Sequence, residues 1–186
     1  MKRTLAFIVV FLIGLGQILN AQDKKNVVKL SLISPFIKTL NLGYERVLNE
    51  KLALQFHAYY TGYKEKSGDP KTKMDGFGII PEFRIYLSEK KTAPGGFFVA
   101  PFVRYDQFNV TESYEDATEN KGSYSAFGGG LLIGHQAVFS NIVTLEAYIG
   151  PQYLFGNTTY DTEGEIDTPR LSGVLPRGGV TIGILF

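Results

Sequence analysis

The sequence predicts an all-β protein that forms an eight-stranded antiparallel up-and-down transmembrane β-barrel. Three observations favour this fold: apolar residues recur at every second position, short and long polar connectors alternate, and the chain ends on an aromatic residue. The composition agrees, with 44% hydrophobic residues, 21 glycines, 14 phenylalanines, 11 tyrosines and no cysteine. The lack of cysteine excludes a disulfide framework and a cysteine-bound zinc site. The near balance of 19 basic and 18 acidic residues gives no sign of a nucleic-acid partner.

Residues 1–21 are expected to be a secretory signal peptide, and residues 22–186 to form the outer-membrane barrel domain. Lys2 and Arg3 supply the basic start of the signal, and Ala21 is a small residue before the expected cleavage point. The apolar stretch between them is also long enough to overlap with N-terminal membrane anchors, which is the alternative for this segment. Export through such a signal would deliver the barrel to the cell outer membrane.

Period-two alternation identifies the strands. In residues 39–48, for example, Leu40, Leu42 and Tyr44 share one face. Asn41, Gly43 and Glu45 share the other, as a strand requires. The alternation is least regular in 26–33 and 122–137. The expected strands are 26–33, 39–48, 51–63, 74–88, 96–109, 122–137, 143–155 and 176–186.

Three prolines interrupt this pattern on the apolar faces of the expected strands. Pro81, Pro101 and Pro151 each remove a backbone donor from the strand ladder. Because a closed barrel has no edge strand to receive them, we expect a β-bulge at each of these positions.

The connectors fall into two classes that alternate along the chain. Short ones are expected at 49–50, 89–95 and 139–141, and longer polar ones at 64–73, 112–122 and 156–173, with 34–38 as a short exception. Short turns at one end and long loops at the other are typical of outer-membrane barrels. A soluble sandwich or a lipocalin-like barrel is the alternative, with the apolar face in a protein core.

The polar face carries charges of both signs in mid-strand, which favours a narrow barrel whose lumen is filled by side chains. Charges removed from water must be paired, so we expect an ionic network in the lumen. Its centre would join two strands that are adjacent in sequence, through Glu82, Arg84, Arg104 and Asp106. The expected network residues are Glu45, Glu82, Arg84, Arg104, Asp106 and Glu146.

The last strand is expected to act as an assembly signal as well as closing the barrel. Val180, Ile182, Ile184 and Phe186 occupy alternate positions counted back from the terminus, so all four face lipid if one does. The pattern resembles that of outer-membrane barrels, which end on an aromatic residue read by the assembly machinery. The expected partners are therefore outer-membrane lipid, lipopolysaccharide and the barrel-assembly machinery, together with an unidentified partner of the extracellular loops.

Several segments resemble a family of outer-membrane β-barrel proteins of unknown function, common in Gram-negative bacteria of the Bacteroidetes type. They are LGYERVLNEKLALQFHAYY at 42–60, GFGIIPEFRIYLSEKK at 76–91, GGFFVAPFVRYD at 95–106, GGGLLIGHQ at 128–136 and YIGPQYLFG at 148–156. The most specific piece is the run from Pro81 to Arg84. The resemblance implies a barrel in the outer membrane and carries no catalytic residues with it.

Few residues could support chemistry. The two histidines, His57 and His135, lie in mid-strand and near the expected periplasmic end, away from outer-leaflet lipid. The acidic connectors 112–122 and 156–173 could bind calcium or bridge divalent ions to lipopolysaccharide, but their spacing does not match an EF-hand. We therefore expect no catalytic residue, cofactor or metal site.

The sequence thus predicts a non-enzymatic integral outer-membrane protein, whose barrel is a frame for surface loops with structural or interaction roles. One alternative is a narrow channel for ions or small solutes. Another is a soluble lipocalin-like carrier of an apolar ligand.

Overall fold

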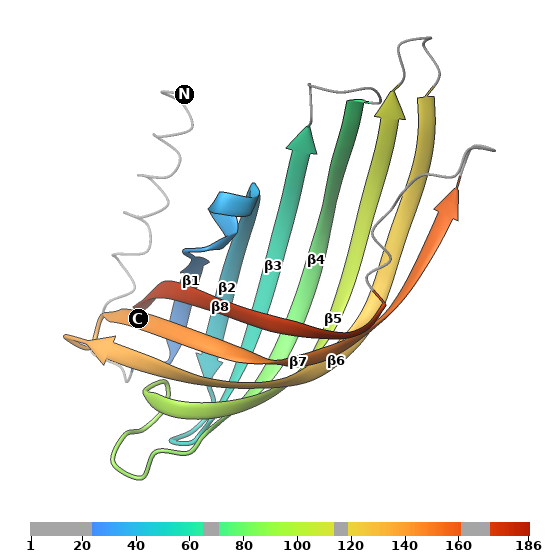
Figure 1. Cartoon of the computed structure of the whole chain (residues 1–186). Helices are drawn as coiled ribbons and strands as arrows, with labels where there is room; N and C mark the ends of the chain where they lie inside the picture. Colours follow the sequence, from blue (N-terminus) through green and yellow to red (C-terminus); the bar gives the residue numbers. More distant parts are fainter. Residues whose placement is uncertain (1–23, 65–70, 114–118, 161–171) are drawn as a thin grey trace, which may run out of the picture.

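A computed structural model describes residues 24–64, 71–113, 119–160 and 172–186. Eight strands form a closed barrel in which each strand pairs antiparallel with the next and β1 pairs with β8 (Figure 1). The predicted eight-stranded up-and-down barrel is therefore confirmed. The strands are β1 (Asn26–Ser31), β2 (Thr39–Val47), β3 (Leu52–Lys64), β4 (Lys71–Tyr86), β5 (Gly96–Ser113), β6 (Glu119–Phe139), β7 (Val143–Tyr160) and β8 (Gly173–Leu185), with a short 3-10 helix η2 (Ser34–Ile37) after β1.

The two ends of the barrel differ. One end, here called the turn end, holds the connectors 48–51, 87–95 and 140–142 together with Asn26 and Phe186. In the shortest of these, Ser140 and Asn141 have φ of 49° and 55°, the positive values that fit a tight hairpin to the strand twist. The opposite end, the loop end, holds η2 and the connections from β3 to β4, β5 to β6 and β7 to β8.

The long loops expected from the sequence contain more residues than the loops of the structure. β3 continues to Lys64, β5 to Ser113 and β7 to Tyr160, so that much of 64–73, 112–122 and 156–173 is paired strand. The apolar alternation fades there, whereas the register set by the lower part of each hairpin continues. The remaining loop residues, 65–70, 114–118 and 161–171, lie outside the described part of the chain, as does the expected signal peptide.

The expected bulges at the three prolines are absent. Around Pro81 some pairs between β4 and β5 lapse, but the residue offset is the same at Ile79–Tyr105 and at Glu82–Phe102. The offset between β6 and β7 is likewise the same on both sides of Pro151, and Pro101 pairs with Leu131 in an unbroken register. Each proline therefore weakens a ladder locally without inserting a residue, because only its donor is missing.

The two faces of the barrel wall have opposite character. The apolar side chains point outward, and Leu40 and Ile149 are 56% and 61% exposed. The polar side chains point inward, and Glu45 and Arg84 are both 0% exposed. Soluble monomers rarely expose a continuous apolar surface of this kind. Within the described residues, no helix combines the length and apolar character needed to cross a membrane.

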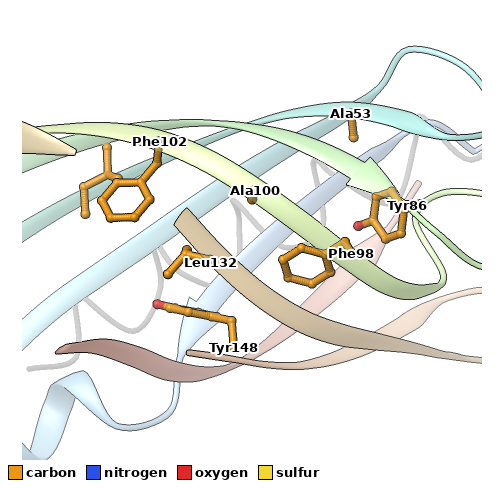
Figure 2. Packing of buried hydrophobic residues seen from close by; sticks show 8 residues of the cluster. Ala53, Tyr86, Phe98, Ala100, Phe102, Leu132 and Tyr148 are labelled. Carbon is orange, nitrogen blue, oxygen red and sulfur yellow. The ribbon is translucent and has the colours of Figure 1, made fainter. Parts of the chain in front are cut away.

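Inward-facing glycines make room for the large side chains of the lumen. An aromatic ring on one strand lies against the glycine directly opposite it on the next strand, where a Cβ would collide with the ring. Figure 2 shows the rings of Tyr86, Phe98, Phe102 and Tyr148 inside the barrel wall. The glycine and ring pairs are Gly43 with His57, Gly78 with Tyr59, Gly134 with Phe98, and Gly179 with Tyr148.

Replacing such a glycine should destabilise the barrel. A Cβ at Gly134 would lie 2.5 Å from Phe98 Cζ and 2.8 Å from the Ala147 carbonyl oxygen, which cannot move away. We expect Gly134→Ala to lower the free energy of unfolding by about 1–3 kcal/mol, measured by urea titration of the refolded protein. Gly62→Ala is the control, because its nearest neighbour would be 3.6 Å away. Equal midpoints for the two variants would contradict this packing.

Candidate functional site

The lumen contains a fully compensated group of charges, here called the central charge cluster. It has three cations and three carboxylates, so their formal charges cancel, and every member is less than 9% exposed. Five strands contribute its charged side chains, and β5 adds aromatic rings. The members are Lys29, Glu45, Glu82, Arg84, Glu146 and Arg177.

Arg84 lies at the centre of this cluster. Its guanidinium makes a two-point contact with Glu146, Nη1 to Oε2 at 2.6 Å and Nη2 to Oε1 at 2.9 Å. Nη2 also donates to Glu82 Oε2 at 3.0 Å. The guanidinium carbon lies 4.3 Å from the centre of the Phe98 ring, which covers its face. Such bidentate pairs are among the strongest hydrogen-bonded contacts between side chains.

Lys29 forms ion pairs with two carboxylates of the cluster, those of Glu45 and Glu146. Its Nζ lies 2.6 Å from Glu45 Oε2 and 2.5 Å from Glu146 Oε2. It also donates to the side-chain oxygens of Gln55 and Gln136, at 2.7 Å and 2.5 Å. The ammonium group is thus surrounded by acceptors, as a buried cation requires.

Arg177 connects the last strand to the cluster. Its Nη2 donates to Glu82 Oε1 at 2.8 Å, and its guanidinium lies 4.5 Å from the Phe102 ring centre. Arg177 Nη1 and, farther along the same two strands, the hydroxyl oxygens of Thr144 and Thr181 are buried and make no hydrogen bond among the described residues. Buried polar atoms of this kind are often bonded to ordered water.

A second set of polar contacts, the loop-side group, lies farther toward the loop end. Arg104 Nε donates to Asp106 Oδ2 at 2.7 Å, and Arg104 Nη2 donates to the Tyr59 hydroxyl oxygen at 2.8 Å. The Tyr59 hydroxyl in turn donates to Asp106 Oδ1. Arg104 Nη1 also donates to Gln152 Oε1 at 3.3 Å. The Arg104 side chain is 18% exposed, so this group is less enclosed than the central cluster.

The structure differs from the single network expected from the sequence. Glu45, Glu82, Arg84 and Glu146 lie in the central charge cluster, whereas Arg104 and Asp106 form the loop-side group. The register explains the division, because Glu82 pairs with Phe102 and Asp106 pairs with Gly78. Four residues separate those two positions on each strand, or about 13 Å at ~3.3 Å per residue.

Two members of the cluster, Lys29 and Arg177, were not expected from the sequence. A count of charges would have predicted two further cations, because the six expected residues comprise four acids and only two arginines. A sealed lumen with two unmatched carboxylates requires two more cations. Lys29, between the outward Val28 and Leu30, and Arg177 on the polar face of β8 are those cations.

The residues of the expected assembly signal lie along one face of β8. Ile182 and Ile184 are exposed on the outside, at 41% and 44%, and Val180 and Phe186 are half-buried on the same face. Phe186 follows the last strand residue and still completes the closure. Its N–H donates to the Asn26 carbonyl at 2.8 Å, and its carbonyl accepts from the Asn26 N–H at 2.9 Å.

The histidines make packing and hydrogen-bonding contacts. His57 Nε2 lies 2.5 Å from Gln55 Nε2, and His57 Nδ1 lies 3.1 Å from Asn41 Oδ1. With the glutamine amide as the donor, this corresponds to a neutral imidazole protonated on Nδ1. His135 packs edge-on against Phe97 on the outer face. Among the described residues, no three His, Asp or Glu side chains are placed to hold a metal ion.

The family assignment rests on most of the chain. Residues 6–169 match the family described as "Protein of unknown function (DUF3575)". The chain belongs to this family. No curated protein matches the chain.

The chain is also similar to solved structures. CarO of Acinetobacter baumannii superposes with a TM-score of 0.51 at 11% identity, covering 89% of this chain and 98% of that chain. The N-terminal β-barrel domain of Pseudomonas aeruginosa OprF has a TM-score of 0.40 at 13% identity, covering 89% of this chain and 100% of that chain. At these identities the CarO likeness supports the fold of this DUF3575 member and no particular activity.

Removing a charge from the central cluster should cost more stability than removing one from the loop-side group. We expect Arg84→Met, which keeps most of the side-chain volume, to lower the free energy of unfolding by about 3–5 kcal/mol because it leaves buried carboxylates unpaired. Arg104→Met should cost less, since water reaches that group. Lys73→Met is the control; its side chain is 53% exposed beside Asp75, and such pairs contribute about 0–1 kcal/mol. Urea midpoints that fall in any other order would contradict the assignment.

Proposed function

We propose that this protein is a non-enzymatic integral outer-membrane barrel with a plugged lumen, which serves as a frame for its surface loops. The observation that carries this proposal is the inverted polarity of the wall. Large apolar side chains cover the outside, and paired charges fill the inside. A bilayer satisfies the first feature, and a narrow eight-stranded barrel filled by side chains accounts for the second.

The same observation disfavours a soluble carrier of an apolar ligand. A lipocalin-like carrier needs an apolar cavity inside and a polar surface outside. Here the interior position of such a ligand is occupied by ion pairs and by rings packed on glycines. The expected signal peptide, which lies outside the described part of the chain, and the expected contact with lipopolysaccharide remain parts of this proposal.

A narrow channel is the second candidate, and one observation favours it. The Thr144 and Thr181 hydroxyls and Arg177 Nη1 are buried polar atoms on β7 and β8 that have no hydrogen-bond partner among the described residues, and ordered water often binds such atoms. Gly179 and Gly183 lie on the same wall, although the Tyr148 and Thr144 side chains cover them. A continuous path of water along β7 and β8 would form only if the Tyr148 and Thr144 side chains moved.

Conductance in planar bilayers separates the two functions. The wild-type protein should give no stable discrete openings, because the central charge cluster closes the lumen. The double variant Arg84→Ala/Glu146→Ala, which removes both partners of the central pair, should conduct if it inserts as a closed barrel. Discrete openings from the wild-type protein would overturn the plugged-frame proposal in favour of the channel.

Phe186 should be required for membrane insertion. Phe186→Asp places a charge at the closing position of β8 and removes the proposed assembly signal, so export should persist while insertion fails. The heat-modifiable band shift on gels, which reports a closed barrel, measures insertion. Phe139→Asp is the matched control, because Phe139 is an exposed aromatic residue at the same turn end. Wild-type amounts of shifted Phe186→Asp protein would argue against a terminal signal.

A further inference from the structure

An apolar groove crosses the outer face of the barrel over β2, β3, β4 and β5. Its volume is about 550 Å³, and outward side chains form most of its lining. The strand register places Arg46, Leu54 and Phe83 in one row across β2, β3 and β4. Pro101 on β5 continues this row by the constant offset between β4 and β5. A second row runs parallel to the first, two residues along each strand, and includes Tyr44 and Pro81.

The groove runs from the rim of the turn end into the wall. Arg46 lies one residue before the end of β2, whereas Pro101 lies five residues after the start of β5. Three steps between strands at ~4.8 Å give a length of about 14 Å. Because strands of a membrane barrel tilt by about 35–45°, this row descends about 8–10 Å, which is within one half of the ~30 Å hydrocarbon core of a bilayer.

The groove is hollow because prolines line it. Pro81 and Pro101 present short rigid rings where neighbouring outward positions carry Leu, Ile or Phe. The pairing between β4 and β5 also lapses beside Pro81. Since proline fixes its own backbone, the hollow is formed before any ligand arrives, which lowers the entropy cost of binding.

A fixed cation stands at the mouth of the groove. Arg46 Nη1 and the Tyr44 hydroxyl both donate to Asn26 Oδ1, each at 2.7 Å. This holds the guanidinium in place with further donors on its planar fork, a geometry that suits phosphate. The described residues at this rim carry more positive than negative charges. The basic ones are Lys24, Lys25, Arg46, Lys51, Lys90 and Lys91, and the acidic ones are Glu50 and Glu89.

We propose that this groove binds one phospholipid, with its phosphate on Arg46 and an acyl chain along Leu54, Phe83 and Pro101. The proposal rests on the membrane location proposed above. With the turn end facing the periplasm, the lipid belongs to the inner leaflet. A cationic mouth and an apolar floor that stays within one leaflet match the two parts of that molecule.

Retention of lipid tests the proposal. The protein is refolded into vesicles of phosphatidylethanolamine and phosphatidylglycerol, transferred to mild detergent, and analysed by native mass spectrometry. The wild-type protein should retain one phospholipid. Arg46→Gln should reduce this adduct about tenfold, the change expected from losing one charge-assisted contact. Lys90→Gln, which removes a charge from the same rim away from the groove, should retain it.

A second pair of variants tests the floor of the groove. Val103→Trp fills its far end and leaves Arg46 unchanged, so the adduct should again fall. Ile133→Trp adds the same ring to an exposed outward position on β6 that does not line the groove, and should have no effect.

Equal retention within either pair of variants would overturn the lipid site. The gel shift and flotation with vesicles, measured on the same samples, report insertion separately. A wild-type chain that does not insert would overturn the membrane location, and this proposal with it. A wild-type chain that inserts while both pairs behave alike would overturn the lipid site alone.

Discussion

The compensation of buried charge in the lumen is the constraint on which the rest of the barrel depends. The backbone ladder connects only neighbouring strands, whereas the ion pairs connect strands across the interior. Arg84 on β4 meets Glu146 on β7, and Lys29 on β1 meets the same carboxylate. Leaving one such charge unpaired typically costs several kcal/mol. The charges also fix which face of each strand points inward, since a one-residue slip of a strand would place its charges on the apolar outer face.

The glycines follow from this constraint. An eight-stranded barrel has an interior just wide enough for side chains, and here the side chains include arginines with aromatic rings stacked on them. Room for a ring on one strand comes from a glycine opposite it on the next, as at Phe98 and Gly134. The inward aromatic rings and the glycines opposite them thus have one cause, the packing of large groups in a narrow tube, whereas other aromatic residues, such as Phe97 and Phe155, lie on the outer face.

The sequence was sufficient to predict which face points inward in the six regularly alternating strands, because the pleat repeats every two residues wherever the two faces meet different surroundings. It was insufficient for register, which is set by pairing partners far apart in the chain. That is why Arg104 and Asp106 were expected in one network with Glu82, from which they lie apart. The same limit explains the loop boundaries. Toward the loop end the outward side chains are no longer apolar. The alternation of apolar and polar residues that identifies a strand in the sequence therefore disappears there, while the hydrogen bonds between the strands persist.

Strand length decides which surfaces of a plugged barrel remain available for interaction. A strand of about 9–11 residues crosses a bilayer, whereas β5, β6 and β7 have 18, 21 and 18 residues. β1 has only 6, so the wall is much taller on one side, as Figure 1 shows. For a barrel in a bilayer, about half of β6 would therefore stand outside the hydrocarbon as part of a sheet that also includes β4, β5 and β7. Interaction through this end would use a paired, twisted sheet that continues directly from the barrel wall.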